Sequence, residues 1–153
     1  MILRVAIVLL VFVMACSTDS SPRGDQVDFD LKVLESDPMI ADFVRRHPEW
    51  PVIKYARADL NNDGRKDVIL IYRIARDANR MRAVLDVGEK YADTNEVPAP
   101  IHDQSIVLRD IDKKPPLEFI VQGRKGARIG YAIFRVEADQ LIDVFGEGME
   151  DCC

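Results

Sequence analysis

Two adjacent cysteines, Cys152 and Cys153, end the sequence and carry its most distinctive chemistry. Gly146 and Gly148 precede them, and glycines leave a chain end with little fixed structure, so we expect residues 146–153 to form a flexible tail. Thiolates bind soft cations, and a mobile pair can close on one ion or pass it to another thiol pair. The pair therefore predicts capture of a thiophilic metal such as mercury(II), an organomercurial, arsenic(III), cadmium or copper(I).

Two other interpretations of the thiol pair stay open. Adjacent cysteines close only a small, strained disulfide ring that is easily reduced, so a redox role is the first alternative. However, the neighbouring Glu150 and Asp151 create the reverse of the electropositive setting that activates a thiol. The second alternative is that the cysteines are unused or join another chain. We favour metal capture, because a metal displaces the thiol protons itself and because idle exposed thiols are a liability.

A second group of candidate ligands lies in an acidic loop. Oxygen-bearing side chains occupy its first, third, fifth and ninth positions and glycine its sixth, namely Asp59, Asn61, Asp63, Asp67 and Gly64. Calcium prefers several hard oxygens in flexible geometry, and the backbone carbonyl of Arg65 would supply another. We therefore expect this loop to bind Ca²⁺ and to brace the fold. The alternative is a turn in which Asp and Asn accept hydrogen bonds from their own backbone.

The acidic loop is not an EF-hand, because Leu70 stands where a glutamate is required and an apolar strand replaces the second helix. The spacing Asp-x-Asn-x-Asp-Gly-x-x-Asp before an apolar strand resembles the calcium loops of integrin-like FG-GAP and VCBS repeats. The resemblance covers one loop and one strand in each unit.

An internal repeat contains this loop. Residues 59–70 align without gaps with residues 110–121, with acidic or amide residues matching at the first, third and ninth places and apolar residues at the second and the last three. We interpret the repeat as two related units, each a loop that leads into a strand. Lys114 and Pro115 replace the fifth-place carboxylate and the glycine in the second unit, so we expect that copy to bind no ion.

The first sixteen residues have the features of a targeting segment. Arg4 is followed by an apolar run to Ala15, which is shorter than the roughly 20 residues of a membrane-spanning helix and fits a secretory signal. Val13-Met14-Ala15-Cys16 resembles a bacterial lipobox, in which the cysteine is acylated and becomes the mature N-terminus. We therefore expect a lipoprotein signal peptide over residues 1–15, lipid on Cys16, a polar tether over residues 16–26, and a location on the extracytoplasmic side of the cell envelope.

The remaining residues, 27–145, predict one β-rich globular domain. Asp37 and Pro38 begin a helix, and Pro48 ends it. Apolar stretches between turn residues predict strands at 52–56, 68–74, 82–87, 105–108, 119–121, 131–136 and 141–145. Connections this short favour antiparallel pairing. The predicted class is α+β, mainly antiparallel β, with the two FG-GAP-like units in a small sheet or sandwich and one N-terminal helix.

Charge and missing motifs exclude several functions. The net charge of −5 argues against nucleic acid as a partner. We find no Ser-His-Asp order, phosphate loop or dinucleotide fingerprint, so an enzyme is not the favoured class. Arg73, Arg76, Arg80 and Arg82 form a basic stretch that we expect to be a solvated face.

A short lipoprotein with a Cys-Cys terminus resembles the Cys-Cys-COOH (seleno)protein family, SaoC, of the selenocysteine-assisted organometal detoxification system of anaerobes. The match lies in Cys16, the mature length and Cys152-Cys153; one terminal cysteine is replaced by selenocysteine in some members. The resemblance implies that the cysteines handle mercury or organomercury outside the membrane, beside partner transport proteins. The rival function is a calcium-stabilised cell-envelope interaction module with unused terminal cysteines.

Overall fold

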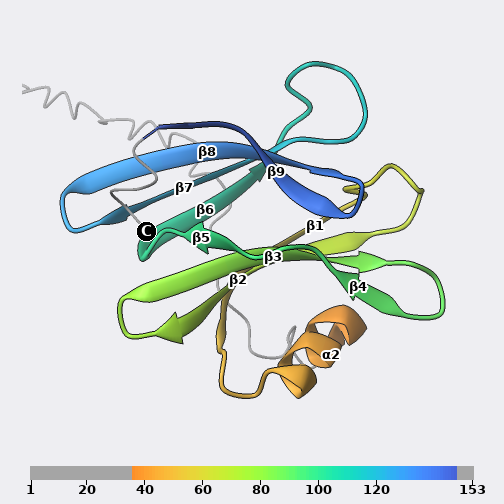
Figure 1. The fold of residues 1–153 in the computed structure, drawn as a ribbon, viewed down its shortest axis with the longest axis horizontal. Coiled ribbons are helices and arrows are strands. Elements are labelled where there is room, and N and C mark those ends of the chain that lie inside the picture. The colour runs from red at the N-terminus through yellow and green to blue at the C-terminus, as the bar shows by residue number, and fades with distance from the viewer. Residues whose placement is uncertain (1–35, 148–153) are drawn as a thin grey trace, which may run out of the picture.

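The computed structural model describes residues 36–147, with the side chain of Glu147 excepted. The predicted signal peptide, Cys16, the tether and the thiol pair at Cys152 and Cys153 lie outside the described residues. Within them the chain forms one helix and nine strands (Figure 1). These are α2 (Pro38–Arg46), β1 (Val52–Ala58), β2 (Asp67–Ala75), β3 (Ala78–Asp86), β4 (Tyr91–Asp93), β5 (Val97–Ala99), β6 (His102–Leu108), β7 (Phe119–Lys125), β8 (Arg128–Glu137) and β9 (Gln140–Glu147).

The helix α2 begins and ends where the sequence predicts. Asp37 is its N-cap, and the Oδ1 atom accepts hydrogen bonds from the amides of Met39 at 3.0 Å and Ile40 at 3.3 Å. These bonds satisfy two of the amides that a helix start leaves without partners. Arg57 on β1 lies 2.9 Å from the other carboxylate oxygen, so the cap also fixes the helix to the sheet.

The strands form two sheets, and all pairings among the described strands are antiparallel. The first sheet has the order β1-β2-β3-β4, with β5 also paired to β3, and the second has the order β6-β7-β8-β9. Each predicted strand is present, and the predicted fold class is confirmed. The sequence missed β4 and β5, because three residues are too few to show a period of two.

Three layers result from the alternation of side chains along β2 (Figure 1). Val68, Leu70 and Tyr72 pack against α2 on one face of the first sheet, in a cluster with Met39, Ile40 and Phe43. Ile69 and Ile71 point to the opposite face, where they meet buried residues of the second sheet, namely Phe119, Val121, Ala132, Phe134, Val136 and Leu141. The domain is therefore a β-sandwich with one of its outer faces covered by the helix.

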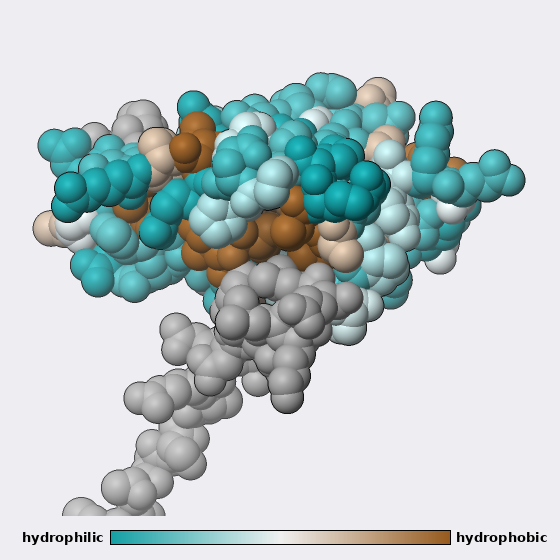
Figure 2. All heavy atoms as spheres, turned by 90° about the horizontal axis from the view of Figure 1, so that it is seen from below, coloured by the Kyte–Doolittle hydropathy of each residue, from teal (hydrophilic) through white to brown (hydrophobic). Residues whose placement is uncertain are grey.

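The two outer faces of the sandwich differ in their apolar content. Seen from the side of α2, the surface is mostly hydrophilic, with apolar residues gathered near its centre (Figure 2). Most of the exposed large apolar side chains belong instead to the second sheet, and they are Val107, Leu108, Ile129, Ile142, Val144 and Phe145. No helix within residues 36–147 has the length and apolarity needed to cross a lipid bilayer.

Asn95, between β4 and β5, links the two sheets at the β9 edge. Its Oδ1 accepts a hydrogen bond from the amide of Leu141 at 2.6 Å, and its Nδ2 donates one to the Leu141 carbonyl at 3.2 Å. One amide side chain thus satisfies both backbone groups of an edge residue, which would otherwise be open to pairing with another chain.

Candidate functional site

The predicted calcium loop joins β1 to β2 and is held by hydrogen bonds from its own backbone. Asp59 accepts from the amide of Asp63 at 3.1 Å and from that of Gly64 at 2.9 Å, each on a different carboxylate oxygen. Asp63 in turn accepts from the amide of Arg65 at 2.8 Å. Gly64 has a φ of +86°, a left-handed conformation that favours glycine, so the sixth position is explained by the turn itself.

Asp67, the ninth residue of the loop, is buried rather than presented to a cation. Its Oδ2 accepts from the amide of Leu60 and its Oδ1 from the amide of Asp86 on β3, both at 2.9 Å. Burial raises the pKa of Asp67, the two amide bonds oppose the shift, and the nearby charges of Asp63 and Asp59 add to it. Asp67 therefore braces the loop against β3.

The structure joins three of the predicted ligands by hydrogen bonds, whereas the fourth, Asp67, bonds to the amides of Leu60 and Asp86. Asn61 donates from Nδ2 to Oδ2 of Asp63 at 3.1 Å. The amide of Asp63 donates both to Oδ1 of Asn61 and to Oδ1 of Asp59, so the three side chains lie side by side. The side chain of Arg65 also reaches Oδ2 of Asp63, at 2.6 Å, and the Arg65 amide and side chain hold the pKa of Asp63 below its usual value. These contacts are those of the self-bonded turn, and calcium binding by this loop stays a prediction.

The second loop, between β6 and β7, repeats the bracing contacts of the first. Glu118 is buried and accepts from the amide of Ile111 at 2.9 Å, as Asp67 does from Leu60. Asp112 accepts from the amide of Lys114 at 2.9 Å, the same pairing of third and fifth positions that Asn61 makes with Asp63. The gapless alignment of the two units therefore holds at the level of individual hydrogen bonds.

An acidic cluster that the sequence did not predict lies in this second loop. Ligand oxygens of Asp110, Asp112 and Glu118 lie within 4.8 Å of one another, the only such group of three among the residues that the structure describes. Arg135 on β8 provides the compensating charge, with Nη1 at 3.8 Å from Asp112 and 3.9 Å from Glu118. The acids were visible in the sequence, but the arginine that faces them comes from a different strand.

The two loops face a common hollow at one end of the sandwich. Its volume is about 290 Å³, and it is lined by Asp59, Asn62, Asp110, Lys114, Pro115 and Leu117. The first acidic residue of each unit thus lines the same depression, together with Lys114.

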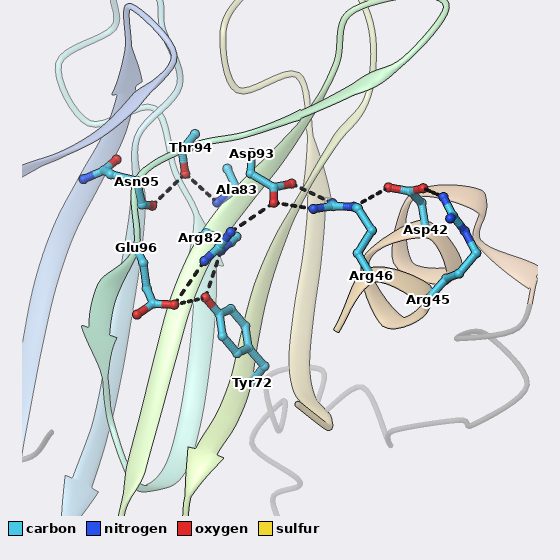
Figure 3. Close-up of polar contacts among 10 residues, drawn as sticks. All are labelled: Asp42, Arg45, Arg46, Tyr72, Arg82, Ala83, Asp93, Thr94, Asn95 and Glu96. Atoms are coloured by element: carbon cyan, nitrogen blue, oxygen red, sulfur yellow. Dashed lines mark hydrogen bonds and ion pairs between the residues drawn. The ribbon is translucent and has the colours of Figure 1, made fainter. Parts of the chain in front are cut away.

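The prediction of a solvated basic face on β2 and β3 is correct for Arg73 and Arg76, which are exposed, but wrong for Arg82. Arg82 is only 15% exposed and lies 3.0 Å from both Asp93 and Glu96 (Figure 3). Its Nε donates to the hydroxyl of Tyr72 at 2.8 Å, and that hydroxyl donates to Glu96 at 2.6 Å. Alternation along β3 places Arg82 on the face that α2 covers, which the spacing of arginines alone does not reveal.

The same network reaches the helix. Arg46 makes two hydrogen bonds to Asp93, at 2.6 and 2.8 Å, and a third to Asp42 at 2.8 Å (Figure 3). Burial alone would raise the pKa of Asp93, but the bonds and charges of Arg46 and Arg82 hold it below its ordinary value of 3.8. With every charged member paired in this way, the cluster is a brace between α2 and the first sheet.

No family model, curated protein or solved structure matches this chain in the comparisons made with known proteins. The candidate site residues therefore rest on their own chemistry and placement. Of these, the acidic loop lies within the described domain, whereas Cys16, Cys152 and Cys153 lie outside the described residues.

Proposed function

We propose that this protein is a lipid-anchored, extracytoplasmic carrier that binds a thiophilic metal or organometal, mercury or organomercury above all, through Cys152 and Cys153. One observation carries the proposal. Residues 36–147 contain no cysteine, so the folded domain offers no thiol that would pair with the two or compete for their metal. The pair follows the end of β9 by only a few residues, and six residues of chain reach roughly 20 Å at most.

The chemistry of capture is a proton exchange. A mercuric ion that binds both thiols forms two sulfur–metal bonds and releases two protons, with no change in oxidation state. Transfer to a partner needs an incoming thiolate to replace one of the two, so the receiving protein must itself carry thiols. Lipid on Cys16 would hold the domain at the membrane, beside a transporter or relay protein of that kind.

The first test replaces the thiols. We expect the reduced protein to bind one mercuric ion, detected by the sulfur-to-mercury charge-transfer absorbance, and Cys152→Ser with Cys153→Ser to bind none. The melting temperature should stay unchanged, because both positions follow the predicted globular domain of residues 27–145. Met149→Leu is the matched control, since it removes a neighbouring thioether and leaves both thiols. Equal mercury uptake by the serine variant would reject the proposal.

A second candidate function, a calcium-stabilised interaction module of the envelope, is supported by the gathering of Asp59, Asn61 and Asp63 in one loop. Calcium would be coordinated by the carboxylate oxygens of Asp59 and Asp63 in place of some of their amide contacts.

The second test is a calcium titration followed by the melting temperature. A protein that binds calcium only when folded gains stability with ligand concentration, so we expect calcium at 100 times Kd to add about 2.7 kcal/mol. The gain should vanish in Asp59→Asn with Asp63→Asn. Asp110→Asn with Asp112→Asn is the matched control in the second unit, where Arg135 already balances the acids, and it should keep the gain. A melting temperature that does not change with calcium would reject calcium binding and leave the loop as a self-bonded turn.

A further inference from the structure

The two sheets repeat the same arrangement of strands. In each sheet four antiparallel strands lie in sequence order, β1-β2-β3-β4 in the first and β6-β7-β8-β9 in the second. The registers agree as well, because rows of directly paired residues cross the two sheets at equivalent places, namely Arg57, Val68, Val84 and Asp93 in the first and Leu108, Phe119, Phe134 and Asp143 in the second. The sequence repeat therefore extends from one loop and one strand to a whole sheet.

Equivalent rows of the two sheets point in the same direction. In the first sheet Val68 and Val84 pack against α2, and in the second sheet Phe119 and Phe134 pack against the first sheet. The order α2, first sheet, second sheet is thus a stack of two units in one orientation (Figure 1). The other face of the first sheet contacts the second sheet, so its equivalent is the outer face of the second sheet. Every helix and strand within residues 36–147 already has its place in this stack, and none of them remains to cover that face.

An apolar row crosses the centre of this outer face. Its members are paired in register, one from each strand, and they are Val107, Ile120, Ile133 and Phe145. The two end members, Val107 and Phe145, are 49% and 51% exposed. The equivalent row of the first sheet packs against the second sheet, and it contains Ala56, Ile69 and Ala83. The same place in the repeat is therefore a contact between sheets in one unit and an exposed surface in the other.

Polar side chains border the apolar row on both sides. Gln122 stands where the first sheet has the buried Ile71, and Arg135 stands where the first sheet has the buried Leu85. An apolar centre with a polar rim is the usual composition of a protein–protein interface. With strands about 4.8 Å apart and residues about 3.3 Å apart, four strands of seven residues give a face of about 19 by 23 Å, which suits a small, reversible contact.

We propose that two copies of this chain associate through the outer faces of their second sheets, with the apolar row of each copy at the centre of the contact. Continued stacking in one orientation is blocked, because α2 covers the face of the first sheet that would have to receive the second sheet of another copy. Within residues 36–147 the sheet face left open on each copy is the same one, so the contact joins identical surfaces about a two-fold axis. Such a dimer is closed and does not grow into a fibre. The contact uses neither the acidic loops nor the cysteines, so the dimer and the proposed metal carrier are tested separately.

Sedimentation at a series of concentrations tests the association. The sample is the predicted mature chain, residues 16–153, with Cys16→Ser, Cys152→Ser and Cys153→Ser, so that neither lipid nor a disulfide joins two copies. We expect an equilibrium between one copy and two copies in the range from about 1 μM to about 1 mM, where small interfaces associate. A single copy at every concentration, or assemblies larger than a dimer, would overturn the proposal.

Charge substitutions locate the contact. Val107→Lys with Phe145→Lys places a positive charge at each end of the apolar row, and we expect it to raise the Kd of the dimer at least about tenfold, because like charges of the two copies would meet. Both side chains are about half exposed, so the melting temperature of the dilute protein should change little. Val44→Lys, at a 37% exposed apolar position on α2, is the matched control and should leave the Kd unchanged. An unchanged Kd in the lysine pair, or loss of the dimer in Val44→Lys, would overturn the proposal.

Thiol labelling gives a second measurement that adds no charge. In the cysteine-free chain, Val107→Cys should react with a maleimide more slowly as the protein concentration rises through the Kd, because the dimer covers this position. Val44→Cys is the control and should react at one rate throughout. A labelling rate of Val107→Cys that does not change with concentration would also overturn the proposal.

Discussion

Asp67 and Glu118 occupy equivalent places in the two loops, and each accepts a hydrogen bond from the amide of the second loop residue, Leu60 or Ile111. Asp67 makes a further bond to the amide of Asp86. A buried carboxylate that serves two amides closes the loop and joins it to the next strand.

We expect Asp67→Asn to lower the free energy of unfolding by about 1–3 kcal/mol, because an amide nitrogen cannot accept and one buried amide would lose its partner. Urea denaturation at neutral pH measures the loss. Asp63→Asn is the control, since Asp63 is exposed on the same loop, and it should leave the midpoint almost unchanged. An Asp67→Asn protein as stable as the original chain would show that the bond to Asp86 or Leu60 contributes nothing.

At the scale of elements, the network around Arg82 joins four parts of the chain. Arg46 comes from α2, Tyr72 from β2, and Asp93 and Glu96 from the β4–β5 region. The carboxyl groups have depressed pKa values in the folded state because arginine and tyrosine contacts outweigh burial. Such groups stabilise the fold when pH is above their pKa in the unfolded chain, and this stabilisation is lost as the pH falls through the folded-state pKa.

We therefore expect the free energy of unfolding to decline as the pH is lowered through and below 3.8, the ordinary carboxyl pKa of Asp93. Asp93→Asn should be less stable at neutral pH and should show a shallower decline. Denaturant titrations at a series of pH values measure both slopes. Glu89→Gln, on the same exposed rim as Arg46, is the control and should keep the full slope. Parallel slopes for Asp93→Asn and the original chain would contradict this role.

Most of the helix and strand positions were predictable from local sequence patterns. The Asp37 cap, Pro48 and the period-two apolar stretches placed α2 and the longer strands within a few residues. The burial of Arg82 was not predictable, because an alternating strand shows which residues share a face without showing which face another element will cover. At the end of α2, the rings of His47 and Trp50 stack with centroids 4.3 Å apart.

At the scale of the whole molecule, the two sheets depend on a shared core. Phe119 opens β7, is fully buried, and stacks on Phe134 with ring centroids 5.8 Å apart. We expect Phe119→Ala to cost about 3–5 kcal/mol, the usual range for removing a buried aromatic ring. Phe145→Ala, on the outer face at 51% exposure, is the matched control and should cost much less. Thermal or urea unfolding of both variants measures the difference, and similar losses would mean that the outer face is covered.

The candidate site was predictable only in part, because some of its residues are far apart in the sequence. The first loop and the repeat are visible as spacing, because their ligands are neighbours in sequence. The approach of the two loops around one hollow, and of Arg135 to Asp112 and Glu118, follows from how the sheets pack. The residue pattern within one segment does not show which distant segment will pack beside it.

The matched bonds from Leu60 to Asp67 and from Ile111 to Glu118 separate the shape of each loop from its ability to bind an ion. What both copies retain is the acid that closes the loop, whereas the residues that could coordinate an ion differ between them. A substitution at the tip of either loop can therefore add or remove a candidate ligand without removing the carboxylate that closes that loop.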